Sequence, residues 1–146
     1  MKLEISCPIR DGIVIITKKQ HSVFYHCGIV AVEKGIPFVF HADPDNKNNK
    51  GGCVQREVLK EYLKDNRIRE IYDACITREQ IYREVTRVWG QKYDHLNFTC
   101  EHFIREITGQ RLKRGVFHSG EKVIIGLVVI SAILIFLRAI FINIKR

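Results

Sequence analysis

A cysteine at the predicted start of a helix has the most informative chemistry in this chain. Cys100 lies in the segment NFTCEHF, residues 97–103. The positive end of a helix dipole favours the thiolate, which is the reactive form of cysteine. Two histidines far upstream, His26 and His41, lie in apolar segments of strand length, so only the fold can bring an imidazole to the sulfur. These residue types predict acyl transfer, in which a thiol attacks a carbonyl and an imidazole takes up and returns its proton.

The backbone of Cys100, the nearby His102 and three other cysteines are expected to assist the site or to have structural roles. The backbone N–H of Cys100, in the first turn of a helix, is a candidate oxyanion donor, a contribution of about 3 kcal/mol. His102 follows two residues later on another side of the helix, so we expect a structural role or an outer hydrogen bond from it. Cys7, Cys53 and Cys75 are expected to be small buried hydrophobic residues.

The cysteine spacing argues against a metal site and a disulfide framework. The five cysteines include no CxxC pair, and their odd number leaves at least one thiol unpaired. A zinc site is conceivable by residue type, but its possible ligands lack the usual CxxC or HxxxH spacing. These possible ligands are His26, Cys27, His95, Cys100 and His102. We therefore expect no metal and a reducing compartment.

The C-terminal part of the chain is predicted to be a membrane anchor. Residues 123–137 are uncharged and nearly all apolar, and residues 139–144 extend this character past Arg138. The resulting length is near the roughly 20 residues that cross a bilayer as a helix. The prediction is a linker over residues 115–122 and a transmembrane helix over residues 123–144. The N-terminus carries no secretory signal, so the preceding domain is expected in the cytosol.

Length and charge fit one domain before this anchor. The 146 residues, 46% of them hydrophobic, leave room for a single core and a tail. The net charge of +8 would suit anionic lipid headgroups, especially through basic residues close to the anchor. No aromatic and basic module supports a nucleic-acid partner, so none is expected.

Local patterns predict the elements that position the candidate residues. Residues 27–32 and 36–41 flank the turn-like Glu33-Lys34-Gly35 and form a predicted antiparallel hairpin. One predicted helix begins with a capping box at residues 77–80 and stops at Gly90, and another begins near Cys100 and ends by Gly109. Further predictions are strands at residues 12–17 and 68–76, a loop at 43–52 and a helix at 54–63. The predicted class is α+β, with an antiparallel sheet packed on helices over residues 1–114.

Three short blocks resemble the phospholipase A and acyltransferase family related to lecithin–retinol acyltransferase. The blocks are YHCGIV at residues 25–30, FVFH at 38–41 and TCEHF at 99–103. The resemblance spans most of the chain and is strongest over CEHF, residues 100–103. It implies a circularly permuted papain-like fold with a C-terminal transmembrane helix, a thioester intermediate, and neither metal nor cofactor.

Position by position, the resemblance implies Cys100 as nucleophile, His26 as general base and acid, and His41 as the residue that orients the imidazole. The implied function is a membrane-anchored enzyme that cleaves an ester of a glycerophospholipid at the mouth of a lipid-facing cleft. The acyl group then passes to water, or to an amine or hydroxyl of another lipid. The implied activities are phospholipase A1/A2 and phospholipid acyltransferase.

Departures from the family pattern leave two alternatives open. Thr99 replaces the family's asparagine and Cys27 its tryptophan, while the tyrosine that assists the oxyanion would fall at Phe24, beside Tyr25. One alternative is a membrane-tethered cysteine peptidase or amidase, because cell-wall endopeptidases use the same residue types. The other is a non-catalytic tail-anchored membrane adaptor that keeps the fold without turnover.

Overall fold

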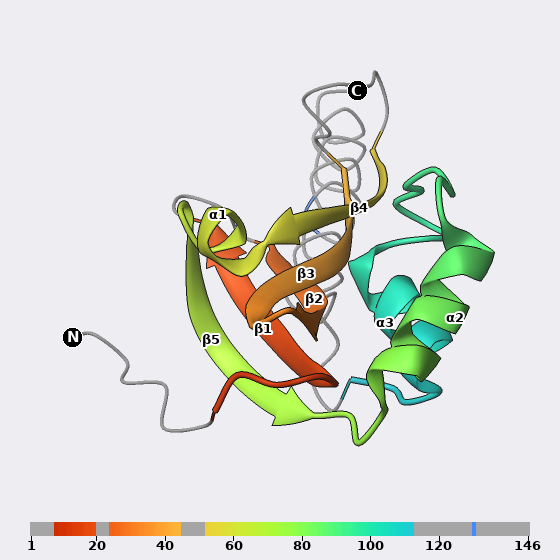
Figure 1. Ribbon diagram of the computed structural model, residues 1–146. Coiled ribbons are helices and arrows are strands. Elements are labelled where there is room, and N and C mark those ends of the chain that lie inside the picture. The colour runs from red at the N-terminus through yellow and green to blue at the C-terminus, as the bar shows by residue number, and fades with distance from the viewer. Residues whose placement is uncertain (1–7, 20–23, 45–51, 113–129, 131–146) are drawn as a thin grey trace, which may run out of the picture. The chain divides into compact units, whose positions relative to one another are not determined.

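The fold is α+β and is built on one antiparallel sheet. The computed structural model describes residues 8–19, 24–44, 52–112 and 130. Five strands lie in the order β4-β3-β2-β1-β5 (Figure 1). The strands are β1 (Ile13–Lys19), β2 (Tyr25–Glu33), β3 (Ile36–Asp43), β4 (Cys53–Val58) and β5 (Asn66–Asp73). The helices are α1 (Leu59–Tyr62), α2 (Arg78–Val88) and α3 (Cys100–Thr108).

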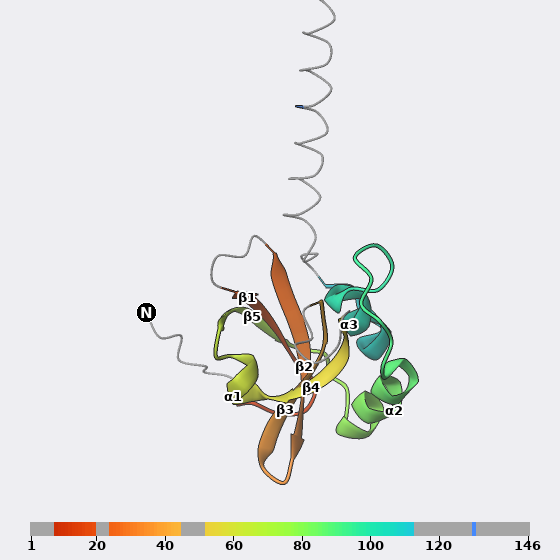
Figure 2. The same cartoon turned by 90° about the horizontal axis from the view of Figure 1, so that it is seen from above.

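Both faces of the sheet are covered. Alternation along β1 places Val14 and Ile16 in a core with α2 and α3, and Ile13 and Ile15 in a second core with Tyr62 of α1. Figure 2 shows α1 and the pair α2 and α3 on opposite sides of the sheet. Because both faces are buried, the central strands are nearly continuous apolar runs, as the sequence has them.

The two central strands diverge near the candidate histidines. The pairing of β2 with β3 ends at Ile29 and Phe40. Beyond that point β2 still pairs with β1 as far as Tyr25, and β3 with β4 as far as Asp43. His26 and His41 lie on these diverging segments. The pairing of β2 with β3 does not extend to them, so the two side chains can approach each other.

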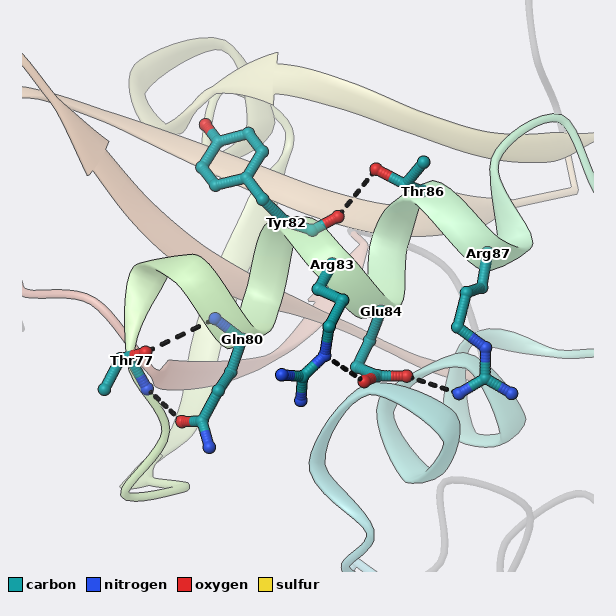
Figure 3. A network of polar contacts seen from close by, with 7 residues as sticks. All are labelled: Thr77, Gln80, Tyr82, Arg83, Glu84, Thr86 and Arg87. Atoms are coloured by element: carbon teal, nitrogen blue, oxygen red, sulfur yellow. Dashed lines mark hydrogen bonds and ion pairs between the residues drawn. The ribbon is translucent and has the colours of Figure 1, made fainter.

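The predicted hairpin and both predicted helix starts are confirmed. β2 and β3 pair antiparallel across Lys34 and Gly35, whose φ angles of 49° and 79° form a two-residue turn. Figure 3 shows the capping box of α2, in which the Thr77 hydroxyl accepts from the Gln80 N–H at 3.3 Å and the Gln80 side chain accepts from the Thr77 N–H at 2.7 Å. Helix α3 begins at Cys100 and is capped by Gly109.

The helix predicted over residues 54–63 is wrong for most of its length. Residues Cys53–Val58 form strand β4, and only Leu59–Tyr62 are helical. The reason is tertiary, because these residues complete the edge of the sheet by pairing with β3. The predicted strand over 68–76 lies instead at Asn66–Asp73, and most of the predicted loop over 43–52 lies outside the described residues.

The predicted fold class, a circularly permuted papain-like fold with a C-terminal transmembrane helix, is wrong. The structure has a five-stranded antiparallel sheet and few, short helices, and among its described residues no helix is both long and apolar enough to cross a membrane. The papain-like part of the prediction rested on three short residue blocks, which do not determine a topology. The transmembrane part rested on hydropathy, which measures apolar character and does not itself establish a spanning helix. The chain divides into two compact units, residues 1–116 and 117–146. Apart from Ile130, the predicted linker and anchor at residues 115–144 lie outside the described residues.

Candidate active site

The structure brings together three side chains that the sequence analysis singled out. His26 Nε2 lies 2.8 Å from His41 Nδ1, and His26 lies close enough to Cys100 to lower the pKa of its thiol. Because His41 takes Nε2 of His26, Nδ1 is the ring nitrogen left for the sulfur. The histidines contact Tyr62 on the α1 side of the sheet, whereas Cys100 belongs to the core under α2 and α3. The two sets meet where β2 and β3 diverge.

Cys100 is buried, but its surroundings favour the thiolate over the thiol. It is the first residue of α3 and is only 3% exposed. A side-chain hydrogen bond from Cys27 lowers the pKa of Cys100 well below its usual value, helped by His26 and the Cys27 backbone and opposed by burial. Burial and the contact with Cys100 raise the pKa of Cys27, which therefore remains a thiol donor. The expectation of a sulfur at the mouth of a cleft is wrong, because Cys100 packs inside the core.

The two histidines take different charge states. Burial lowers the pKa of His26, but the hydrogen bond to Cys100 and nearby negative charges outweigh it, so the net shift is upward. Burial and the positive charge of His26 lower the pKa of His41 well below its usual value. These shifts favour an imidazolium at His26, which would donate Nε2–H to the neutral ring of His41 and leave Nδ1–H for Cys100. The directions of these shifts favour a thiolate and imidazolium pair beside a second, neutral imidazole.

The sequence analysis missed two buried hydroxyls, those of Thr17 and Tyr62, which are linked by hydrogen bonds to the backbone of His26. Thr17 Oγ1 donates to the His26 carbonyl at 3.2 Å and lies 3.4 Å from the Tyr62 hydroxyl. Since the single proton of Thr17 goes to the carbonyl, Tyr62 is the donor in the second bond. The Tyr62 ring lies 5.8 Å from the His26 ring and 5.0 Å from the His41 ring, measured between centroids. The apolar pattern of residues 54–63 gave Tyr62 only as a core residue, so no local signal indicated this role.

The start of α3 is fixed by a second capping box. The Thr99 hydroxyl accepts from the His102 N–H at 3.4 Å, and His102 Nδ1 accepts from the Thr99 N–H at 3.3 Å. His102 thus has the structural role that we expected, and it is not a base for Cys100. The N–H groups of the first helical turn have no partner within a helix, so that of Cys100 remains the candidate oxyanion donor.

Several other candidates lie in different settings. Phe24 is exposed, and Tyr25 packs against the core under α2 and α3, so neither takes the place that Tyr62 has beside both imidazoles. His95 is exposed and makes an edge-to-face contact with the Tyr93 ring. Cys75 is exposed and Cys53 is partly buried, so the prediction of burial is wrong for the former, and Cys7 lies outside the described residues. In the described part of the chain, no group of three or more His, Cys, Asp or Glu side chains is arranged to hold a metal ion.

Comparison with known proteins does not add to this site. A scan against models of protein families found no match to the chain, and a search of curated proteins found none either. The resemblance to the acyltransferase family therefore rests on the short residue blocks alone. The function must be argued from the geometry of Cys100, His26 and His41.

Proposed function

We propose that the protein is a thiol acyl-transfer enzyme that cleaves an ester of a glycerophospholipid, with Cys100 as nucleophile, His26 as acid and base, and His41 as the orienting residue. The observation that carries this proposal is the pairing of a depressed-pKa thiol with an imidazole that a second imidazole holds at 2.8 Å. Such a pair supplies nucleophile and proton carrier in one site. The lipid ester as substrate rests on the resemblance of the blocks around these three residues.

The proposed reaction has two halves. In the first, the Cys100 thiolate attacks the ester carbonyl carbon, a C–S bond forms, and Nδ1–H of His26 protonates the leaving alkoxide as the C–O bond breaks. A lysophospholipid leaves and a thioester remains. In the second, neutral His26 accepts a proton from water, an amine or a hydroxyl, whose heteroatom attacks the thioester and releases the thiolate. His41 does not exchange protons with the substrate and acts by holding His26.

The test incubates the full-length protein with vesicles of phosphatidylcholine and phosphatidylethanolamine. Mass spectrometry would follow lipid products and a hydroxylamine-sensitive acyl adduct on Cys100. We expect both in the wild type, and a loss of product formation by roughly a thousandfold or more in Cys100→Ala, as for other covalent nucleophiles. Cys75→Ala is the matched control, because it removes an exposed thiol outside the site. Full turnover by Cys100→Ala would refute the mechanism.

The same assay tests the peptidase or amidase alternative when peptides replace the vesicles. Cleavage of peptides but not of lipid esters, with the same dependence on Cys100, would assign the site to amide substrates. The acyl-enzyme chemistry would then stand, while the lipid substrate would not.

Burial of Cys100 favours a second candidate, a protein that retains the site without turnover. At 3% exposure, a lipid ester reaches Cys100 only if neighbouring side chains move. A non-catalytic protein would keep the low thiol pKa, so Cys100 would react with a small alkylating reagent at low pH but form no acyl adduct with any ester. Detection of that adduct would exclude this candidate.

A further inference from the structure

One buried nitrogen of the candidate site lacks a hydrogen bond. His41 Nε2 is buried, and no described residue forms a hydrogen bond with it. Its closest carboxylate oxygen is Glu57 Oε2 at 3.7 Å, which is beyond hydrogen-bond distance. A buried polar group without a partner is costly, so this near contact needs a physical explanation.

The sheet register places Glu57 next to His41. In the pairing of β3 with β4, Val39 lies opposite Glu57 and His41 lies opposite Gln55. His41 and Glu57 are therefore diagonal neighbours on one face, a separation that a long side chain can bridge. β4 is the edge strand and the Glu57 side chain is 39% exposed, so the carboxylate reaches the ring from the solvent-facing edge of the sheet.

The charge of Glu57 distinguishes the two neutral forms of His41. In the Nε2–H form, the ring directs a proton toward the carboxylate and a lone pair at Nδ1 toward His26 Nε2–H. In the Nδ1–H form, a lone pair would face the carboxylate, and Nδ1–H would compete with Nε2–H of His26. A negative charge beside Nε2 favours the first form, and only this form accepts from the protonated His26.

We propose that Glu57 is a positioning residue that holds His41 in the Nε2–H form and thereby directs His26 toward Cys100. The purpose of this arrangement rests on the proposed function, but the form of the His41 ring can be measured without it. Glu57, His41, His26 and Cys100 then form a row of neighbouring polar groups from the exposed edge of the sheet to the buried sulfur.

Other ionisable groups also act on this pair of rings, so the test must separate Glu57 from them. Asp43 is part of the same face, and its carboxylate accepts from Gln55 at 2.8 Å. The ionisable groups that contact or act on the rings are Asp43 from β3, Glu57 from β4, Tyr62 from α1 and Cys100 from α3. Of these, Glu57 has a carboxylate oxygen 3.7 Å from His41 Nε2.

The experiment uses the full-length protein with ¹⁵N-labelled histidine. Ring nitrogen shifts report the form of His41, and peptide mass spectrometry reports the rate at which iodoacetamide alkylates Cys100 at pH 6.5. The variants are Glu57→Gln, which removes the charge at constant shape, Glu57→Asp, which keeps it, and Glu61→Gln as the control, an exposed glutamate four residues later. We expect wild type, Glu57→Asp and Glu61→Gln to show the Nε2–H form alone.

In Glu57→Gln we expect both forms of His41 and an alkylation rate about threefold lower, which corresponds to about half a pKa unit. Glu57→Lys, with a positive charge beside Nε2, should favour the Nδ1–H form. An unchanged Nε2–H form in both variants would overturn the proposal. A wild type that fails to turn over lipid would contradict the proposed function only, because neither readout here depends on turnover.

Discussion

Two helices of this domain begin with the same device in different surroundings. In α2 the capping box joins Thr77 and Gln80, and in α3 it joins Thr99 and His102. In both, the threonine hydroxyl accepts from the N–H three residues later and the side chain there accepts from the threonine N–H. The box of α2 is exposed, whereas Thr99 is fully buried.

The residue after each threonine shows what this difference produces. Arg78 begins α2 and donates to the carbonyl of Val32 in β2 at 2.9 Å, a contact that joins the helix to the sheet. Cys100 begins α3 and faces His26. A capping box thus fixes where a helix starts. When the box is buried, as at Thr99, it also holds the first helical residue, Cys100, in a fixed position in the core.

The largest stability difference is expected between the two threonines. Thr99→Ala should lower the free energy of unfolding by about 2 kcal/mol and Thr77→Ala by about 1 kcal/mol or less, because the buried cap leaves its partners without water to replace it. Urea denaturation measures both, and Thr99→Ser is the control that keeps the hydroxyl. Equal losses in the two alanine variants would show that burial of the box adds nothing.

A smaller effect is expected from Cys27, which contacts the start of α3 and has no counterpart at α2. Cys27→Ala removes the thiol donor to Cys100, so the pKa of Cys100 should rise. The expected result is alkylation of Cys100 about tenfold slower at pH 6.5, in line with a hydrogen bond to a charged group. Cys27→Ser, which keeps a donor, is the control. An unchanged rate in Cys27→Ala would remove Cys27 from the account.

Acidification should weaken the domain through groups near α3 and not through the uncharged box of α2. Burial and His26 lower the pKa of His41, so below the unfolded value of about 6.5 the unfolded chain binds a proton that the native ring does not. Stability therefore falls as the pH decreases, and the depressed pKa of Cys100 acts in the same direction. His26, whose pKa is raised, is protonated in both states below this pH and adds no slope there.

The share of His41 in this loss should be about 1 kcal/mol between pH 7 and pH 5.8. Urea denaturation at the two pH values measures it as the difference between the wild type and His41→Asn. The same pH dependence in both proteins would mean that His41 is not held neutral.

The sequence predicted those parts of the fold that local chemistry determines. The turn at Lys34 and Gly35 and the box at Thr77 follow from residue type alone. The strand at Cys53–Val58 could not be predicted, because its residues are helical by spacing and are extended only through pairing with β3. The start of α3 at Cys100 was predictable, but the box that fixes it was not, since histidine is an unusual partner for a capping threonine.

For the site, residue type indicated Cys100, His26 and His41, and the structure brings them together. The supporting groups gave no local signal. Tyr62 and Glu57 belong to no motif, and their positions beside the rings depend on the divergence of β2 from β3 and on the register of β4. These positions are determined by pairing between strands that are distant in sequence, so no short segment of the sequence could predict them.

The central claim, that Cys100 is an activated thiol paired with His26, is tested most directly by the pH dependence of its alkylation. Wild type and His26→Gln would be treated with iodoacetamide from pH 5 to 10, with Cys100 followed by peptide mass spectrometry and the exposed Cys75 as internal reference. We expect the wild-type midpoint well below the ordinary thiol value of about 8.5, and a midpoint near or above that value in His26→Gln. A midpoint at or above 8.5 in the wild type, or the same profile in both proteins, would contradict the account.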